Sequence, residues 1–273
     1  MREFDVCHLG TANVICCHEV DGYLVDPGPA SSIERLLEQI GDEQPRGLLL
    51  THIHFDHAGG AGALVRRWPE LPVWVHERGA PHLHDPSRLV RSARRIWPDD
   101  FDRLWGEVVP IPERNLRPLV GGETVDGFRV AYTPGHAIHH VAYLHEASGS
   151  AYTGDVAGVR VGDGPIMVPT PPPDIDLEAW RASIATIRDW APQRLCLTHF
   201  GSFEGDVAEH LATLGEALLL WGEIARHTDA AGYAEAVRRR VGDGPYAAAT
   251  LQAAPPETLW AGLRRYWETA EPS

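Results

Sequence analysis

Apolar residues in the first 200 positions fall into short runs of strand length, and these runs alternate with stretches of helical period. The run GLLLT at 47–51 is apolar throughout until its last residue, which is typical of a strand buried on both faces. The runs at 13–20 and 23–26 are joined by Asp21-Gly22, a strong signal for a β-hairpin. Further strands are predicted within 72–76, 128–136, 140–146, 150–155 and 194–201. This alternation predicts an α/β fold.

Between the strands, apolar residues recur every three or four positions, as they do on one face of a helix. Residues 31–41 carry such a stripe. Ser31 and Glu34 have the spacing of a capping box at its start, and Gly41 is a stop signal at its end. We expect further helices at 61–68 and from about Asp176.

The alternation is interrupted twice. From about residue 77 to 118, Arg, Trp and Pro become frequent, and two helical stretches bounded by prolines replace the strands. From 205 to 273 the pattern is helical throughout. We therefore predict a main domain at 1–204 with a helical insert at about 77–118, followed by a C-terminal helical extension at 205–273 that packs on it.

Composition narrows the classes of partner. The chain has 273 residues and a formal net charge of −14, and a field of that sign repels phosphate backbones, so we do not expect nucleic acid as a partner. No run reaches the roughly 18 apolar residues of a membrane span, and the N-terminus lacks a signal-peptide pattern, so we expect no membrane partner. The four cysteines form no C-x-x-C pair, which favours reduced thiols and a cytoplasmic location.

The candidate chemistry begins directly after the apolar run at 47–51, in the segment T-H-I-H-F-D-H. In extended backbone, side chains two positions apart project to the same face, so His52 and His54 can reach one metal ion. Asp56 and His57 follow where the chain must turn into a glycine-rich helix start, so they can face a second point nearby. This density of imidazole and carboxylate groups predicts a metal site.

Three single residues share one property with that segment, because each follows an apolar strand. His136 comes after VAYTPG, Asp155 after SAYTG, and His199 after RLCLT. In α/β folds, functional groups collect at such strand ends because the rigid sheet fixes the loops there. We expect these three side chains to complete the site.

These motifs, in this order, resemble the metallo-β-lactamase superfamily over roughly residues 5–204. The resemblance implies a four-layer αββα sandwich and makes residues 1–204 the catalytic domain. It implies that His52, His54 and His136 hold one metal ion, that Asp56, His57 and His199 hold another, and that Asp155 bridges both. Imidazole and carboxylate ligands suit zinc, with iron or manganese as alternatives. Asp56 is the expected catalytic carboxylate, and His140 is expected to orient a ligand.

Asp155 also indicates a branch of the superfamily. Resistance-type β-lactamases of this fold have Cys or a non-ligand at that place, whereas an Asp bridge resembles hydroxyacylglutathione hydrolases and lactonases. The expected function is therefore a hydrolase that uses a metal-bridging hydroxide on a small ester, thioester or lactone. Alternatives are a persulfide dioxygenase with a single iron, a phosphodiesterase or β-lactamase-type hydrolase, and a non-catalytic binding protein.

The substrate itself is not encoded in any motif. Because the shared fold accounts for the strands and metal loops, we expect residues 77–118 and 205–273 to shape the pocket for a small-molecule substrate. Both segments are rich in Trp and Arg, which supply apolar walls and anion contacts. A competing view is that the C-terminal helices form the interface of a homodimer.

Overall fold

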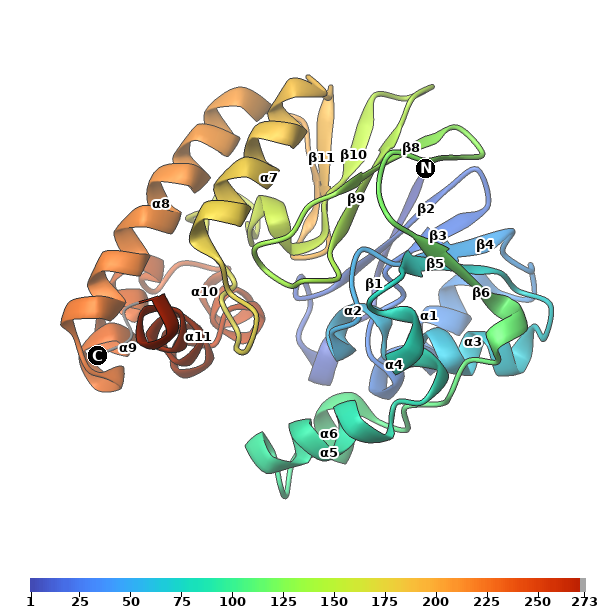
Figure 1. Ribbon diagram of the computed structural model, residues 1–273, viewed down its shortest axis with the longest axis horizontal. Helices are drawn as coiled ribbons and strands as arrows, with labels where there is room; N and C mark the ends of the chain where they lie inside the picture. Colours follow the sequence, from blue (N-terminus) through green and yellow to red (C-terminus); the bar gives the residue numbers. More distant parts are fainter. Residues whose placement is uncertain (271–273) are drawn as a thin grey trace.

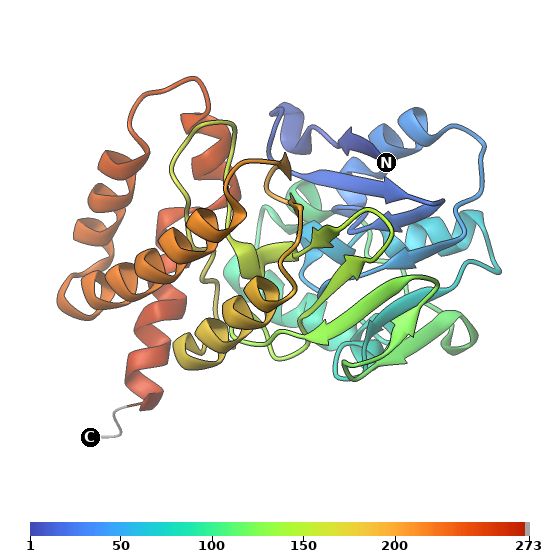
Figure 2. The ribbon, with the colours of Figure 1, turned by 90° about the horizontal axis from the view of Figure 1, so that it is seen from above.

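The computed structural model describes residues 1–270 as two β-sheets that face each other, with helices on both outer sides (Figures 1 and 2). Within these residues each sheet has six strands. The layers follow the order helix, sheet, sheet, helix, which confirms the four-layer sandwich that the sequence predicts.

The first sheet is built from the N-terminal part of the chain, and its spatial order is the same as its sequence order. Its strands are β1 (Arg2–Asp5), β2 (Cys16–Val20), β3 (Tyr23–Val25), β4 (Gly47–Leu49), β5 (Val73–His76) and β6 (Leu116–Leu119). The pairing is antiparallel from β1 to β3 and parallel from β3 to β6. The predicted hairpin joins β2 to β3, and Asp21 and Gly22 both have the positive φ that such a turn needs.

The second sheet has its strands in reverse order, from β12 to β7. They are β7 (Thr124–Val125), β8 (Phe128–Tyr132), β9 (Val141–His145), β10 (Ser150–Tyr152), β11 (Arg194–Leu197) and β12 (Gly201–Phe203). Only the pairing of β10 with β11 is parallel among these described strands. The chain therefore crosses over between β10 and β11, through α7 (Leu177–Asp189).

Strand β4 shows why the continuous apolar run is needed. Leu49 packs into the core between the two sheets, with Tyr143 of the facing sheet. Leu48 and Leu50 point the other way, into the core that includes Leu36 of the outer helix α1 (Ile33–Ile40). All these side chains are buried, so the strand is apolar on both faces, as its sequence predicts.

Helices cover both outer faces. Figure 1 shows α1 and α3 (Ala61–Arg67) beside the first sheet, and α7 with α8 (Val207–His227) beside the second. The predicted capping box of α1 is wrong. Ser31 lies before the helix, and its hydroxyl donates to the carbonyl of Leu104 at 2.7 Å. The hydroxyl of Ser31 thus donates to a distant carbonyl instead of accepting from a backbone N–H of the helix.

The segment 77–118 contains three helices, α4 (Ala80–His84), α5 (Ser87–Ile96) and α6 (Phe101–Trp105). Its last residues, from Leu116, are not helical but begin β6, which pairs with β5. Phe101 and Ala93 of this segment form a small apolar core with Phe55, separate from the two main cores. The insert therefore packs directly against the residue between His54 and Asp56.

The C-terminal part is helical as expected, with α8 followed by α9 (Ala230–Val241), α10 (Ala247–Ala253) and α11 (Pro256–Ala270). Helix α11 lies against the loop at 169–173, where the Thr170 hydroxyl donates to the carbonyl of Leu259 at 2.9 Å. In the part of the chain that the structure describes, no helix has the length and apolarity to cross a membrane.

Candidate metal centre

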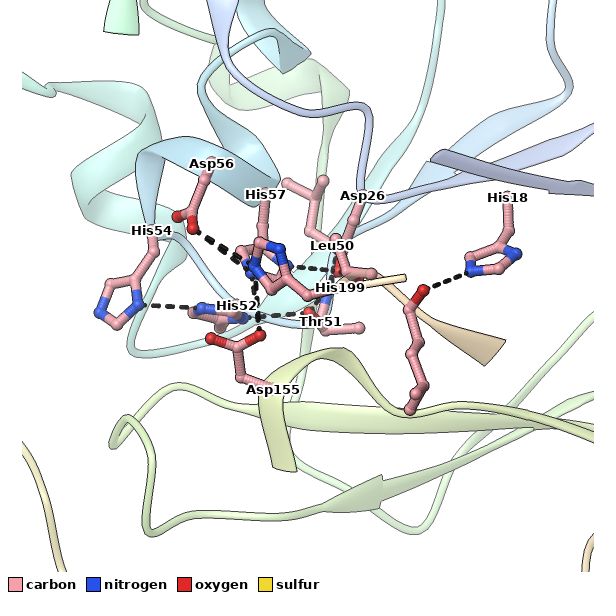
Figure 3. A network of polar contacts seen from close by, with 12 residues as sticks. His18, Asp26, Leu50, Thr51, His52, His54, Asp56, His57, Asp155 and His199 are labelled. Carbon is pink, nitrogen blue, oxygen red and sulfur yellow. Dashed lines mark hydrogen bonds and ion pairs between the residues drawn. The ribbon is translucent and has the colours of Figure 1, made fainter. Parts of the chain in front are cut away.

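All seven predicted ligand residues lie at one edge of the sandwich, where strands of both sheets end. His52 and His54 follow β4, and Asp56 and His57 lie in the short helix α2 (Phe55–Ala58). The other three follow strands of the second sheet: His136 after β8, Asp155 after β10 in a 3₁₀ turn at Gly154–Ala157, and His199 after β11. Figure 3, which labels all of these residues except His136, shows Asp155 facing His52, His54, Asp56 and His57 from the other side of the site.

The backbone turns sharply at His54, which explains how one short segment serves two points in space. His54 is extended, while the next residue starts α2, and the carbonyl of His54 accepts from the backbone N–H of His57 and Ala58. His52 and His54 are therefore on extended backbone and Asp56 and His57 on a helical turn. The predicted division of the motif into two pairs follows from this change of conformation.

The side chains form three overlapping groups, in each of which the candidate ligand atoms lie within 4.8 Å of one another. These groups are His52, His54 and His136; His52, His57 and Asp155; and Asp56, His57 and His199. Every residue of the predicted set belongs to at least one group. The structure thus brings together all seven residues that the sequence selects.

Four of the five histidines, all but His54, have Nδ1 held by a residue outside the cluster and Nε2 directed at their neighbours in it. Nδ1 of His136 contacts the carbonyl of Pro169 at 2.8 Å, and Nδ1 of His199 contacts that of Val14 at 2.6 Å. A carbonyl can only accept, so both rings carry hydrogen on Nδ1 and present the lone pair of Nε2. This is the arrangement that metal-binding histidines adopt in proteins.

Asp26 is a residue of the site that the sequence did not reveal. Its carboxylate is fully buried and lies 2.8 Å from Nδ1 of His57. It also accepts from the backbone N–H and the hydroxyl of Thr51, at 2.8 and 2.7 Å, and from the hydroxyl of Thr198 at 2.9 Å. Thr51 and Thr198 directly precede His52 and His199, so one carboxylate fixes His57 and the starts of two ligand loops.

His140, which we expected to orient a ligand, is buried beside the cluster but makes no hydrogen bond to any of the seven residues. Its Nδ1 lies 2.8 Å from the hydroxyl of Thr133, and its ring stacks on that of His52 with centroids 5.0 Å apart. Its effect on His52 acts through packing. The hydrogen bond that orients the ring of His52 is made with Thr51: because the Thr51 hydroxyl donates to Asp26, Nδ1 of His52 donates to its oxygen at 3.0 Å.

The electrostatic environment favours the ligand forms of His52, His54 and Asp155, whereas nearby carboxylates, against the effect of burial, raise the pKa of His57 and His199. Burial lowers the pKa of His52 well below its usual value and, together with the charge of His136, lowers the pKa of His54 to about 3. Burial alone would raise the pKa of Asp155, but the positive charges of His57 and His136 outweigh it and hold this pKa well below its usual value. The carboxylate is ionised and these two imidazoles are neutral, which are the forms that bind a cation.

Three buried polar atoms inside the cluster have no hydrogen-bond partner among the described residues 1–270: Nε2 of His57, Nε2 of His199 and Oδ1 of Asp155. In addition, Nε2 of His52 and Nε2 of His136 each lie 3.0 Å from Nδ1 of His54. Unsatisfied buried polar groups and lone pairs converging at this distance are costly unless a cation lies among them. The residues present therefore fit a divalent metal ion by the chemistry of the donor set.

Other histidine, arginine and tryptophan side chains outside the cluster have structural roles. The ring of His76 is buried and stacks on Tyr132 with centroids 4.6 Å apart. Arg94 pairs with Asp102 within the insert. Trp180 is fully buried and donates to the carbonyl of Val156 at 2.9 Å, so it is a core residue.

The comparisons with known proteins agree with this geometry. The family model of the metallo-beta-lactamase superfamily matches residues 7–199. The metallo-beta-lactamase fold-containing protein ST1585 of Sulfurisphaera tokodaii is 26% identical over 242 residues, which cover 85% of this chain and 87% of that protein. Its crystal structure matches the fold with a TM-score of 0.69, covering 92% of this chain and 93% of that one, at 24% identity. The chain belongs to the metallo-beta-lactamase superfamily, as its motifs indicate.

The matches also bear out the predicted class of enzyme, a hydrolase of this superfamily. A hydroxyacylglutathione hydrolase of Hamiltonella defensa is 32% identical over 120 residues, 44% of this chain but only 37% of that protein's length. A solved structure described as TTHA1623 in a di-iron-bound form is 27% identical, with a TM-score of 0.50, and covers 69% of this chain and 87% of that one. The glutathione-thioester hydrolases thus match about half of this chain or less.

Proposed function

We propose that the seven residues hold two divalent metal ions, His52, His54 and His136 on one ion and Asp56, His57 and His199 on the other. The observation that carries this proposal is the position of Asp155 between the two sets. Its Oδ2 lies 3.2 Å from Nε2 of His136, and its Oδ1 lies 3.2 Å from Nε2 of His57. A carboxylate whose two oxygens each face one of the two sets could bridge the two metal ions.

The chemistry that such a pair supplies when bound is a hydroxide nucleophile near neutral pH and polarisation of the carbonyl under attack. The chain's own residues orient this pair and handle protons. Asp56 is the more accessible of the two cluster carboxylates, with 26% of its side chain exposed against 5% for Asp155. In our proposal, Asp56 receives the proton of the attacking water on Oδ1, the oxygen that is not the one paired with His57 and His199.

We propose a small thioester, ester or lactone as the substrate, with zinc as the resident metal and iron or manganese as alternatives. The support is the class of the curated relatives, which include hydroxyacylglutathione hydrolases, together with the bridging carboxylate. The di-iron form of a relative makes iron a serious alternative to zinc. Residues 77–118 and 205–273 are proposed to line the approach to the centre. The proposed partner is this small molecule, and a homodimer through the C-terminal helices is the alternative role of that segment.

The test is turnover by metal-loaded protein on a panel of a hydroxyacyl glutathione thioester, a lactone, a phosphodiester, a β-lactam and, under oxygen, a persulfide. We expect hydrolysis of the thioester or the lactone. Asp155→Ala should abolish it, because both sets lose a shared ligand, whereas His140→Ala should cost about 10–100-fold at most. Oxygen consumption with the persulfide and no hydrolysis would replace the proposal with a dioxygenase. Near-full turnover by Asp155→Ala would refute the bridge.

A further inference from the structure

The loop at residues 7–13 is strained and rigidly held. Cys7, Leu9 and Asn13 have φ of 46, 53 and 62, the left-handed region that residues other than glycine rarely adopt. The carboxylate of Asp5 holds both ends of the loop, because it accepts from the backbone N–H of Cys7 at 2.9 Å and of Asn13 at 2.8 Å. Strain of this kind persists where the surrounding structure fixes a functional conformation.

The side chain that this loop fixes is His8. It is 4% exposed, and its ring stacks on that of Trp105 of α6, with centroids 5.7 Å apart and an interplanar angle of 11°. The carbonyl of His8 accepts from the side-chain amide of Gln252, in α10, at 2.9 Å. The N-terminal loop, the insert and the C-terminal helices therefore meet at one residue, His8, the insert at its ring and α10 at its backbone carbonyl.

Both stacked rings carry an unsatisfied nitrogen. Nδ1 of His8 and Nε1 of Trp105 are buried and have no hydrogen-bond partner within residues 1–270. The indole nitrogen can only donate, and Nδ1 of a neutral imidazole can donate in one of its two tautomers. A buried donor without an acceptor costs about 1–3 kcal/mol, so two of them on adjacent rings indicate that an acceptor from outside the chain completes the site.

This pair of rings lies beside the candidate metal centre. The ring of Trp105 is 6.0 Å from that of Phe55, the residue between His54 and Asp56. Burial lowers the pKa of His8. The charge of Asp56 raises this pKa, and the charges of His199 and Arg103 lower it. The three charged groups therefore lie close enough to act on the His8 ring. Arg103 also lines an adjoining surface cavity of about 350 Å³. Arg103 pairs with Asp100 at 2.9 Å, and Glu34 and Arg35 line the same cavity, so charges of both signs lie on this side. The acceptor is therefore argued from the donors: two N–H groups on adjacent rings suit the two oxygens of a carboxylate, which only accept.

We propose that Nδ1 of His8 and Nε1 of Trp105 form a donor pair that binds a carboxylate group of the substrate next to the metal centre. The proposal deepens the proposed function and rests on it for the identity of the reacting centre. It narrows the substrate class to small acyl compounds with a free carboxylate. His8 and Trp105 are then residues that position the substrate and determine specificity.

The direct test is the indole N–H resonance of Trp105, in the ¹⁵N-labelled, metal-loaded full chain. The chain has nine tryptophans, and the signal that is missing in Trp105→Phe identifies the residue. Acetate and acetamide are matched probes of nearly equal shape, one a carboxylate and one neutral. We expect acetate to shift the Trp105 signal at concentrations at which acetamide does not.

Matched variants separate direct binding from binding at the metals alone. His8→Phe keeps a stacked ring without a donor and should weaken acetate binding about tenfold or more, the loss expected for a hydrogen bond to a charged group. His8→Asn, which restores a donor near the place of Nδ1, should recover much of the affinity. Trp97→Phe is the control, because Trp97 packs against Trp105 in the same aromatic cluster but has no unsatisfied buried nitrogen.

Three results would overturn the donor pair: an unmoved Trp105 signal, equal shifts with acetamide, or unchanged acetate affinity in His8→Phe. The last would mean that acetate binds at the metals alone. Failure of the proposed function is distinguishable, because the titration needs no turnover. If the protein hydrolyses no substrate of the panel but its Trp105 signal shifts with acetate, the donor pair stands and the proposed hydrolase activity is wrong.

Discussion

At the scale of single residues, the buried carboxylate of Asp26 organises the candidate centre without belonging to it. It accepts from Thr51 and Thr198, on the two loops that carry His52 and His199, and it contacts His57. Its charge fixes the hydrogen of the His57 ring on Nδ1 and keeps Nε2 free. Such supporting groups commonly affect metal affinity almost as much as the ligands do.

Asp26→Asn should therefore lower metal affinity about 10–100-fold, because an amide cannot accept from the Thr51, Thr198 and His57 donors together. Competition with a metal chelator of known affinity measures the effect. Asp189→Asn, at an exposed carboxylate that pairs only with Arg188, is the control and should leave affinity unchanged. Equal affinity in the two variants would show that Asp26 has no part in forming the centre.

Residues of the site differed in how far the sequence revealed them. The ligand set could be predicted because four members lie in one short segment and the rest follow apolar strands. Asp26 could not, because its partners Thr51 and Thr198 lie 25 and 172 residues away. His8 was hidden for the same reason. Its place in a site depends on contacts with Trp105 and Gln252, and these contacts form only in the folded chain.

At the scale of elements, helix α11 supports the centre through the loop at 169–173. Thr170 donates to the carbonyl of Leu259 in α11, and the neighbouring carbonyl of Pro169 holds Nδ1 of His136. Gly262 allows this close packing, because a Cβ atom built there would lie 2.0 Å from the carbonyl oxygen of Thr170. The position of a candidate ligand thus depends on a helix more than a hundred residues away in the chain.

Gly262→Ala should displace the loop that holds His136 and so weaken binding at the His52, His54 and His136 set. Small displacements of reacting groups can cost about 100-fold, so we expect a loss of at least about tenfold in turnover together with weaker binding of one metal ion. Isothermal titration with zinc and a turnover assay measure the two effects.

Gly215→Ala is the matched control for that substitution. Gly215 lies within α8, and a Cβ built there meets nothing within 4 Å, so alanine should stabilise the helix by about 0.5–1 kcal/mol and leave metal binding intact. If Gly262→Ala binds two metal ions as tightly as Gly215→Ala, α11 does not support the ligand loop.

The elements themselves followed the hydrophobic pattern closely where the period was clear. The buried strand β4 and the β2–β3 hairpin were predictable from apolar runs and an Asp-Gly turn. The start of α1 was not predictable, because the hydroxyl of Ser31 donates to the Leu104 carbonyl of the insert. The end of the insert was missed because β6, with Arg117 and Pro118 in it, has no apolar run of its own.

At the scale of the whole molecule, the three parts outside the two sheets converge on one side of the candidate centre. The loop at 7–13, the insert through Trp105, and α10 through Gln252 meet at His8. The expectation that residues 77–118 and 205–273 shape the pocket stays a prediction, and these contacts support it. The absence of a nucleic-acid partner also stays a prediction, based on the net charge of −14.

The central claim is that this chain holds two metal ions bridged by Asp155, and counting the ions tests it most directly. Elemental analysis of protein loaded with zinc, iron or manganese and then freed of excess metal should give two ions per chain. The same protein with Asp155→Ala should give fewer than two. One iron per chain, unchanged after incubation with added zinc or manganese, would contradict the account, as would two tightly bound ions in Asp155→Ala.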